Sequence, residues 1–141
     1  MEKRPNILII DAQGGGVGRL LVSAIRQEWP GADLTAGGGN SAATAAMLKA
    51  GADRGATGEN AVAVACRSAD VILGPIGIVI ADAMLGEITP KMAAAVAQSD
   101  AKRILIPFDH CDNIIVGVAE TGMKALVKEA VAVLMKSVNP S

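Results

Sequence analysis

The chain has 141 residues, with 13 basic and 14 acidic side chains and a formal net charge of -1 at pH 7. This length is typical of one domain, and we expect residues 1–141 to form one. The balanced charge offers no attraction to nucleic acid or to an anionic membrane, and only two residues, Trp29 and Phe108, are available for base stacking. We therefore predict neither nucleic acid nor membrane as a partner.

The first strand and helix are indicated by hydrophobic pattern. Hydrophobic residues make up 51% of the chain, and strands buried on both faces form continuous apolar runs. Asn6–Ile10 is such a run, closed by Asp11 and a glycine cluster, which predicts a buried strand followed by a tight turn. From Val17 to Ile25, apolar residues recur at three- and four-residue spacing, which predicts an amphipathic helix.

A weaker copy of this unit follows. Asp33–Ala36 predicts a short strand, and after three glycines either Asn40 or Ser41 caps an Ala-rich helix that ends near Gly51. Asn60–Ala69 has alternation typical of a strand but the length and alanine content of a helix, and we favour the helix.

The second half of the chain continues to alternate strands with helices. Few residues separate the last two predicted strands, so we expect them to form an antiparallel or offset edge pair. The whole pattern predicts an α/β fold: a doubly wound, mostly parallel, Rossmann-like sheet in three layers. The predicted elements here are strands Val71–Gly74, Arg103–Pro107 and Asn113–Val118, and helices Ile78–Leu85, Thr89–Val96 and Thr121–Lys136.

The turn after the first strand is the segment most indicative of function. Glycines there allow a sharp turn, let a phosphate approach the backbone, and direct free helix amides at the anion. Gly16-Val17-Gly18 is similar to the end of the short-chain dehydrogenase turn, although Ala12 and Arg19 stand where the dinucleotide pattern has glycines. The alternative is a merely structural turn. The residues expected to bind the nucleotide here are Asp11, Gln13, Gly14, Gly15, Gly16, Val17 and Gly18.

The second glycine cluster predicts the other half of a cofactor site. About twenty residues after the first turn, where an acid usually binds the ribose, the chain has glycines followed by Asn40 and Ser41. We therefore expect Gly37, Asn40 and Ser41 to accept a phosphate, which favours NADP slightly over NAD. Pro75 and Gly77 are either a strand-ending turn or a wall of the same cleft.

Catalytic candidates are few. Asp109, His110 and Cys111 follow a predicted strand, and a histidine acid/base or a cysteine nucleophile is conceivable there, against a plain polar loop. No second His or Cys cluster completes a metal shell, so we predict no metal. The chain has no Tyr, which excludes the short-chain dehydrogenase mechanism.

Cellular location is inferred from the N-terminus and the cysteines. The first residues lead directly into a strand-like run rather than into an apolar signal region. Cys66 and Cys111 form no disulfide framework. We predict a cytoplasmic protein with reduced thiols.

The run from residue 40 to 60, with Gly74–Gly77 and Met84–Pro90, resembles a small bacterial family of unknown function, and the likeness covers nearly the whole chain. The resemblance implies a compact Rossmann-like domain and no particular activity. We predict a nucleotide-binding protein whose favoured ligand is NAD or NADP. Two alternatives stay open: a small oxidoreductase or transferase with a site completed across an oligomer interface, and a homo-oligomeric sensing or scaffold subunit without nucleotide. The apolar composition favours a homodimer.

Overall fold

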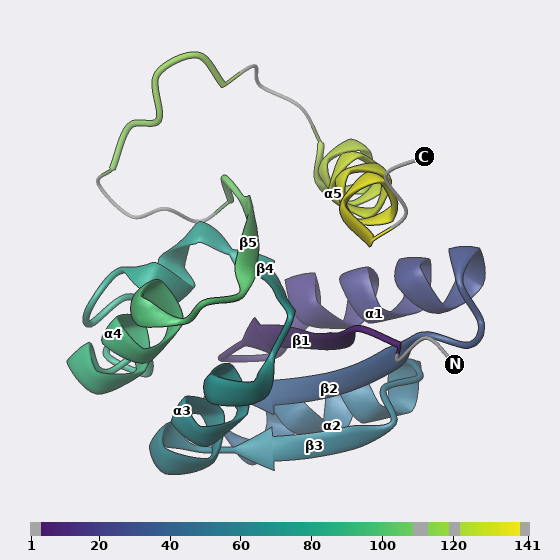
Figure 1. The fold of residues 1–141 in the computed structure, drawn as a ribbon. Coiled ribbons are helices and arrows are strands. Elements are labelled where there is room, and N and C mark those ends of the chain that lie inside the picture. The colour runs from purple at the N-terminus through teal and green to yellow at the C-terminus, as the bar shows by residue number, and fades with distance from the viewer. Residues whose placement is uncertain (1–3, 109–112, 119–121, 139–141) are drawn as a thin grey trace.

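The computed structural model describes residues 4–108, 113–118 and 122–138, which form a β-sheet between two layers of helices (Figure 1). Helices α1, α2 and α5 cover one face of the sheet, and α3 and α4 cover the other. In chain order the elements are β1 (Asn6–Asp11), α1 (Gly16–Glu28), β2 (Asp33–Gly38), α2 (Ser41–Ala50), β3 (Arg54–Thr57), α3 (Glu59–Ser68), β4 (Val71–Pro75), the short 3-10 helix η1 (Ile76–Val79), α4 (Pro90–Gln98), β5 (Lys102–Ile106) and α5 (Met123–Val138).

The sheet has five parallel strands in the order β3-β2-β1-β4-β5. β1 lies at the centre, where Ile7 is in register with Leu34 of β2 on one side and with Val71 of β4 on the other. The chain moves outward from β1 to β3, then crosses back to β4 and moves outward the other way. This topology confirms the predicted doubly wound, three-layer α/β fold, and it creates a switch point between β1 and β4.

β1 supplies both hydrophobic cores because its side chains alternate between the two faces of the sheet. Ile7 and Ile9 pack beneath α1, α2 and α5, whereas Leu8 and Ile10 pack beneath α3 and α4. All four are at most 1% exposed. Fully burying such a side chain contributes about 1.5–3 kcal/mol each, so the unbroken apolar run of this strand follows from its central position.

The helices agree largely with the sequence patterns. The ambiguous segment Asn60–Ala69 forms α3, as favoured, and Asn40 caps α2 by accepting a hydrogen bond from the amide of Ala43 (2.9 Å). Thr89 caps α4, whose first residue is Pro90. Within the described ranges, no helix has the length and apolarity needed to cross a membrane.

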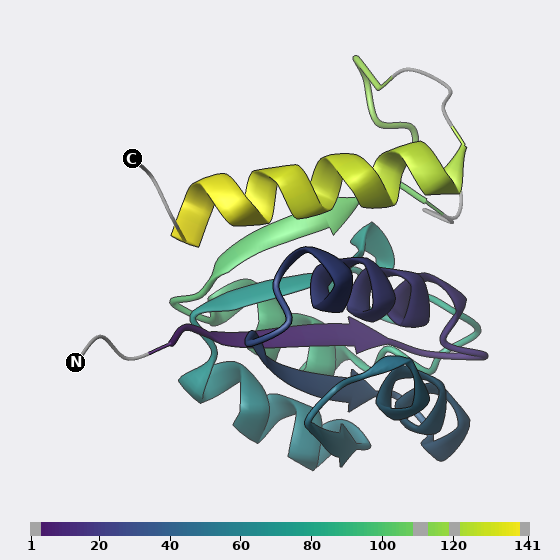
Figure 2. The ribbon, with the colours of Figure 1, turned by 90° about the vertical axis from the view of Figure 1, so that its right-hand side faces the viewer.

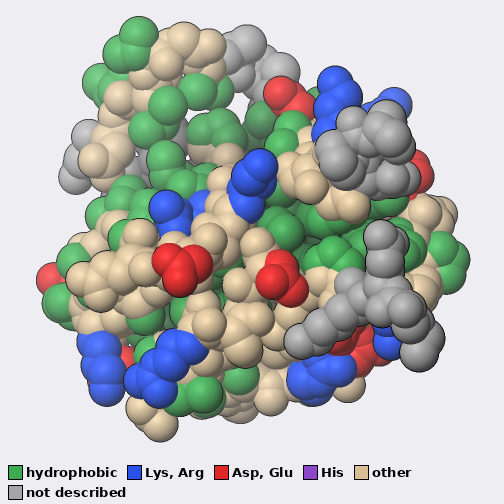
Figure 3. Space-filling view, in the orientation of Figure 1, with side chains coloured by type: hydrophobic (Ala, Val, Ile, Leu, Met, Phe, Trp, Pro, Cys, Tyr) green, Lys and Arg blue, Asp and Glu red, His purple; other side chains and the backbone are tan. Residues whose placement is uncertain are grey.

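The predicted strand Asn113–Val118, and with it the antiparallel edge pair, is wrong. These residues form no strand, and the described part of β5 pairs with β4 alone. The segment is exposed instead, with Ile114 at 88% and Val116 at 94%, and Figure 3 shows hydrophobic side chains over this loop at the upper left. Strand propensity of β-branched residues depends on packing against a neighbour, and here the side chains of Ile114 and Val116 stand in solvent.

The predicted helix Ile78–Leu85 is also wrong. Only the 3-10 turn Ile76–Val79 forms, and a series of turns leads from it to α4. Apolar composition does not distinguish a buried helix from a buried turn, and here the chain buries its apolar residues at irregular spacing. Those residues are Ile78, Ala83, Met84 and Ile88.

β3 was not predicted because its four residues, Arg-Gly-Ala-Thr, have no strand-like pattern. It is an edge strand whose residues are exposed or half-buried, paired in register with β2. A Cβ added at Gly55 would overlap the methyl group of Thr44 from α2, so close packing of the helix explains the glycine.

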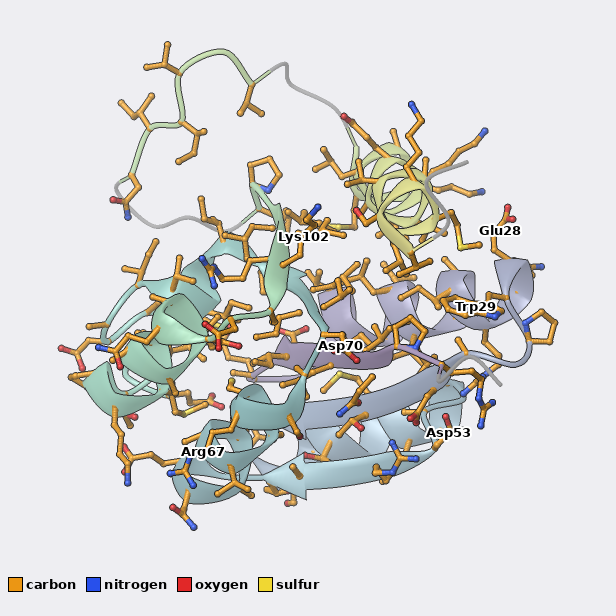
Figure 4. All side chains as sticks on the ribbon, in the orientation of Figure 1. Glu28, Trp29, Asp53, Arg67, Asp70 and Lys102 are labelled. Carbon is orange, nitrogen blue, oxygen red and sulfur yellow. The ribbon has the colours of Figure 1, made fainter. Side chains whose placement is uncertain are left out.

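Arg26 ties the ends of several elements together at the amino edge of the sheet. Its guanidinium donates to the carbonyl oxygens of Gly51 (2.7 Å) and Ala32 (2.7 Å) and to the Asp53 carboxylate (3.0 Å). Asp53 in turn accepts from the amide of Leu34 (2.8 Å). Figure 4 shows Asp53 beside the start of β3. One ion pair thus joins α1 to the first residues of β2 and β3.

This network predicts a pH-dependent contribution to stability. The pKa of Asp53 lies below its ordinary value of 3.8, first because the Leu34 amide donates to it and also because of Arg26. An acid with a lowered folded-state pKa stabilises the fold above its unfolded pKa, and this stability is lost as pH falls through the folded pKa. We expect Asp53→Asn to lower the urea midpoint at neutral pH, and the difference from wild type to shrink below pH 3.8. The exposed Asp100→Asn variant is the control, and a pH-independent difference would contradict the assignment.

Candidate functional site

The candidate site is a cleft of about 260 Å³ at the carboxyl ends of β1 and β4. This is the edge to which the arrowheads of β1, β2 and β5 point in Figure 2, opposite the two marked termini. It coincides with the switch point, where open α/β sheets bind their ligands. The cleft is lined by Asp11, Ala12, Gln13, Gly14, Gly16, Val17, Arg19, Leu20, Pro75, Met84, Phe108 and Met123.

The glycine turn leaves backbone donors open to this cleft. Gly15 has φ +71°, a left-handed conformation, and its amide donates to the carbonyl oxygen of Ala12 (3.0 Å). α1 then begins at Gly16. A Cβ added at Gly14 or Gly16 would meet nothing within 4 Å. Among the described residues, no acceptor bonds the amides of Gly14 and Gly16, which therefore remain available to an anion.

Asp11 is a buried carboxylate that organises the turn. It ends β1, is 4% exposed, and accepts hydrogen bonds from the amides of Ala12 (2.8 Å) and Gly18 (2.7 Å). Burial raises the pKa of Asp11, while the amides of Gly18, Ala12 and Val17 oppose the rise. Because its two oxygens bond the amides at the start and at the end of the turn, Asp11 positions this stretch of backbone.

Gly18 is required by close packing, not by contact with the cleft. A Cβ there would overlap the sulfur of Met47 in α2 and come within 3.0 Å of the Asp11 Cβ. Met47 is fully buried, so it has little room to move away. The predicted binding residues Gly18 and Gly15 therefore shape the turn, whereas Gly14 and Gly16 face the cleft.

Glu87 is a polar residue of this region that the sequence analysis missed. Its Oε1 accepts from the amide of Gln13 (3.0 Å) and from Nδ2 of Asn40 (2.6 Å). Nδ2 of Asn40 also donates to the carbonyl oxygen of Gln13 (3.0 Å). Glu87 comes from the segment between η1 and α4, so it bridges the turns that follow β1 and β2. The only sequence signal for it was its position after a strand that ends at the switch point.

The segment that carries Glu87 has an unusual backbone. Asp82, Met84 and Leu85 have φ of 66°, 57° and 58°, and Gly86 has φ 88°. A non-glycine residue held in this left-handed region costs about 1–3 kcal/mol and persists only where the surroundings enforce it. Here the burial of Met84 and Ile88 enforces it, and Leu85 is left 97% exposed.

Gly37, Asn40 and Ser41, which were expected to bind a phosphate, are not among the residues that line this cleft. Gly37 lies within β2, where an added Cβ would meet Ile10 and Leu8 of the core. Asn40 is engaged with Ala43, Glu87 and Gln13. Ser41 is the exposed first residue of α2. Gly37 therefore serves the packing of the core, and Asn40 serves the capping of α2.

Of the two residues Pro75 and Gly77, one lines the cleft and the other does not. Pro75 ends β4 and lines the cleft. Gly77 lies in η1, where an added Cβ would approach Met84 at 3.1 Å, so it packs beneath the Glu87 segment instead.

The catalytic candidates Asp109, His110 and Cys111 lie outside the described residues. Within the described ranges, no three His, Cys, Asp or Glu side chains gather in a way that would hold a metal. Cys66 is a free, buried thiol in α3, and burial raises its pKa to about 11, which makes it unreactive.

A parallel sheet ordered 3-2-1-4-5, with a glycine turn at its switch point, defines a Rossmann-like α/β protein. The chain belongs to the DUF3842 family, described as a domain of unknown function, whose family model matches residues 6–139. No curated protein and no solved structure matches the chain. The expected membership in a family of unknown function is consistent with this result, and function must be argued from the site.

The two helical glycines make a matched pair for testing the role of the turn. We expect Gly18→Ala to lower the free energy of unfolding by about 1–3 kcal/mol, because the methyl group overpacks against Met47 and Asp11. Gly16→Ala, two residues earlier, should leave it unchanged or raise it by up to ~1 kcal/mol. Urea denaturation measures both, and equal destabilisation by the two would contradict this assignment.

Proposed function

We propose that the protein binds a nucleotide through its phosphate at the cleft between β1 and β4. The observation that supports this most directly is the pair of open amides at Gly14 and Gly16, with empty space where their side chains would be. They lie at the N-terminus of α1, whose partial positive charge favours an anion. Arg19 lines the same cleft and supplies a full positive charge.

The rest of the ligand would lie against an apolar wall. Leu20, Met84 and Phe108 line the cleft together with Pro75 and Met123. An apolar wall with a few convergent polar groups is the usual character of a small-molecule site. A flat base or nicotinamide ring suits this wall better than a second phosphate does.

The proposal concerns binding rather than a reaction. Among the described lining residues, Asp11 is the one carboxylate, and its oxygens are held by the amides of Ala12 and Gly18. These two bonds give Asp11 a role in holding the glycine turn in the shape that would receive a phosphate. We therefore state the function as nucleotide binding.

A ligand screen with one blocking variant tests the proposal. Purified protein is heated with phosphate, AMP, NMN, FMN, NAD or NADP, and a ligand at 100 times its Kd should stabilise the fold by ~2.7 kcal/mol and raise Tm by roughly 5–10 °C. Gly16→Val should abolish the shift, because the side chain would extend into the open space in front of the amides.

Gly31→Val is the matched control for that variant. Gly31 follows the end of α1, and an added Cβ there also meets nothing within 4 Å, but it is remote from the cleft. It should retain the full ligand-induced shift. If no phosphate-bearing ligand raises Tm of the wild type at millimolar concentration, the proposed function is wrong.

A further inference from the structure

The carboxyl end of β2 differs from that of a dinucleotide site. In a dinucleotide-binding fold, the adenosine ribose lies there and an acidic residue binds its hydroxyls. Here β2 ends at Gly38, and the next side chain, Asn40, is engaged in capping α2 and in contacts with Glu87 and Gln13. Thr44 is equally occupied, because its hydroxyl bonds Thr57 (2.8 Å). This end of the sheet offers little to a second nucleotide.

The Glu87 bridge crosses the space that the adenosine ribose would need. Its Oε1 joins the Gln13 amide on the β1 side to the Asn40 side chain on the β2 side. An added Cβ at Gly39 would stand only 3.5 Å from this oxygen, so Glu87 lies directly over the ends of both strands. The two turns and Glu87 therefore form one continuous wall beside the glycine turn.

This wall is anchored in the core. Ile88, next to Glu87, is fully buried, and Ala83 and Met84 are each 6% exposed. The amide of Asp82 donates to the carbonyl oxygen of Ile88 (2.7 Å), and the amide of Ile88 donates to that of Ala83 (3.2 Å). Displacing the backbone of this segment would expose these apolar side chains and break these bonds, so the fold fixes the position from which the Glu87 side chain reaches Gln13 and Asn40.

The space on the other side of the wall is small. The cleft of about 260 Å³ lies between the glycine turn, β4 and the start of α5. Sites for drug-sized ligands usually enclose about 300–1,000 Å³. One nucleotide fits this volume better than two nucleotides joined by a pyrophosphate.

From this geometry, and resting on the proposed function, we infer that the ligand is a nucleoside monophosphate and that the Glu87 bridge excludes dinucleotides. The phosphate lies at the amides of Gly14 and Gly16, and the base packs against the apolar side chains of Leu20 and Phe108. Glu87 acts as a specificity determinant by shape, because its contacts close the path towards β2.

NAD provides the sharpest test, because it is AMP and NMN joined through their phosphates. We would measure the Kd of AMP, NMN and NAD for the full chain by isothermal titration calorimetry. We expect the better of the two mononucleotides to bind the wild type at least 10-fold more tightly than NAD does. The readout is the Kd of NAD divided by the Kd of the better mononucleotide, because this ratio cancels any general effect on phosphate affinity.

Two substitutions at one position separate shape from charge. Glu87→Gln retains an oxygen that accepts from the Gln13 amide and from Asn40, so the wall stays closed and the ratio should stay as in the wild type. Glu87→Ala removes the bridge and should bring the ratio down towards one. Glu28→Ala, at the far end of α1 in Figure 4, controls for loss of a surface carboxylate. Circular dichroism confirms that each variant is folded.

The outcomes distinguish this inference from the proposed function. If NAD binds the wild type as tightly as the better mononucleotide, the inference is overturned while the nucleotide site stands. If Glu87→Gln lowers the ratio as much as Glu87→Ala does, charge rather than the bridge decides, and the inference is again overturned. If neither mononucleotide nor NAD binds, the proposed function fails and the inference fails with it.

Discussion

A buried carboxylate at the end of the central strand holds the glycine turn at the carboxyl edge of the sheet. Asp11 accepts from the amides of Ala12 and Gly18, so it fixes both the exit of the chain from β1 and the first turn of α1. Burial disfavours a charged carboxylate and raises the pKa of Asp11, and the surrounding amides offset part of this rise. Because α1 packs on β1 and α2, a shift of this turn would disturb the core on one whole face of the sheet.

The same interaction decides which amides can meet a ligand. The N-terminus of a helix has unpaired donors, and Asp11 takes that of Gly18. The amides of Gly14 and Gly16, nearer the solvent, are left. An anion would therefore bind in front of the turn and beside Arg19. It would not lie closer to the N-terminus of α1, because the Asp11 carboxylate occupies that place.

The sequence predicted those features that local pattern determines. The apolar run of β1, the turn after it and a cap at Asn40 or Ser41 have causes within a few residues, and each was predicted; Asn40 is the residue that caps α2. The predictions failed where distant contacts decide. β3 is a strand only because β2 lies beside it, and Asn113–Val118 has the composition of a strand but forms none.

The site shows the same limit. Gly14, Gly16 and Gly37 look equivalent in the sequence, yet two face the cleft and the third fills a place in the core. The role of Glu87 could not be predicted from its neighbours in the sequence, since the apolar residues before it predicted a helix. Only the left-handed turns that follow Asp82 carry its carboxylate to Gln13 and Asn40.

The position of Glu87 explains why the strained backbone from Asp82 to Gly86 is retained beside the cleft. Left-handed residues persist only where the surroundings enforce them, and here they lie on the path that carries Glu87 to the ends of β1 and β2. The strain is offset by burial of Met84 and Ile88, whose positions depend on the irregular path. A wall held by apolar anchors keeps its shape with or without a ligand, so selectivity at this edge would arise from the fold itself and would need no closing motion.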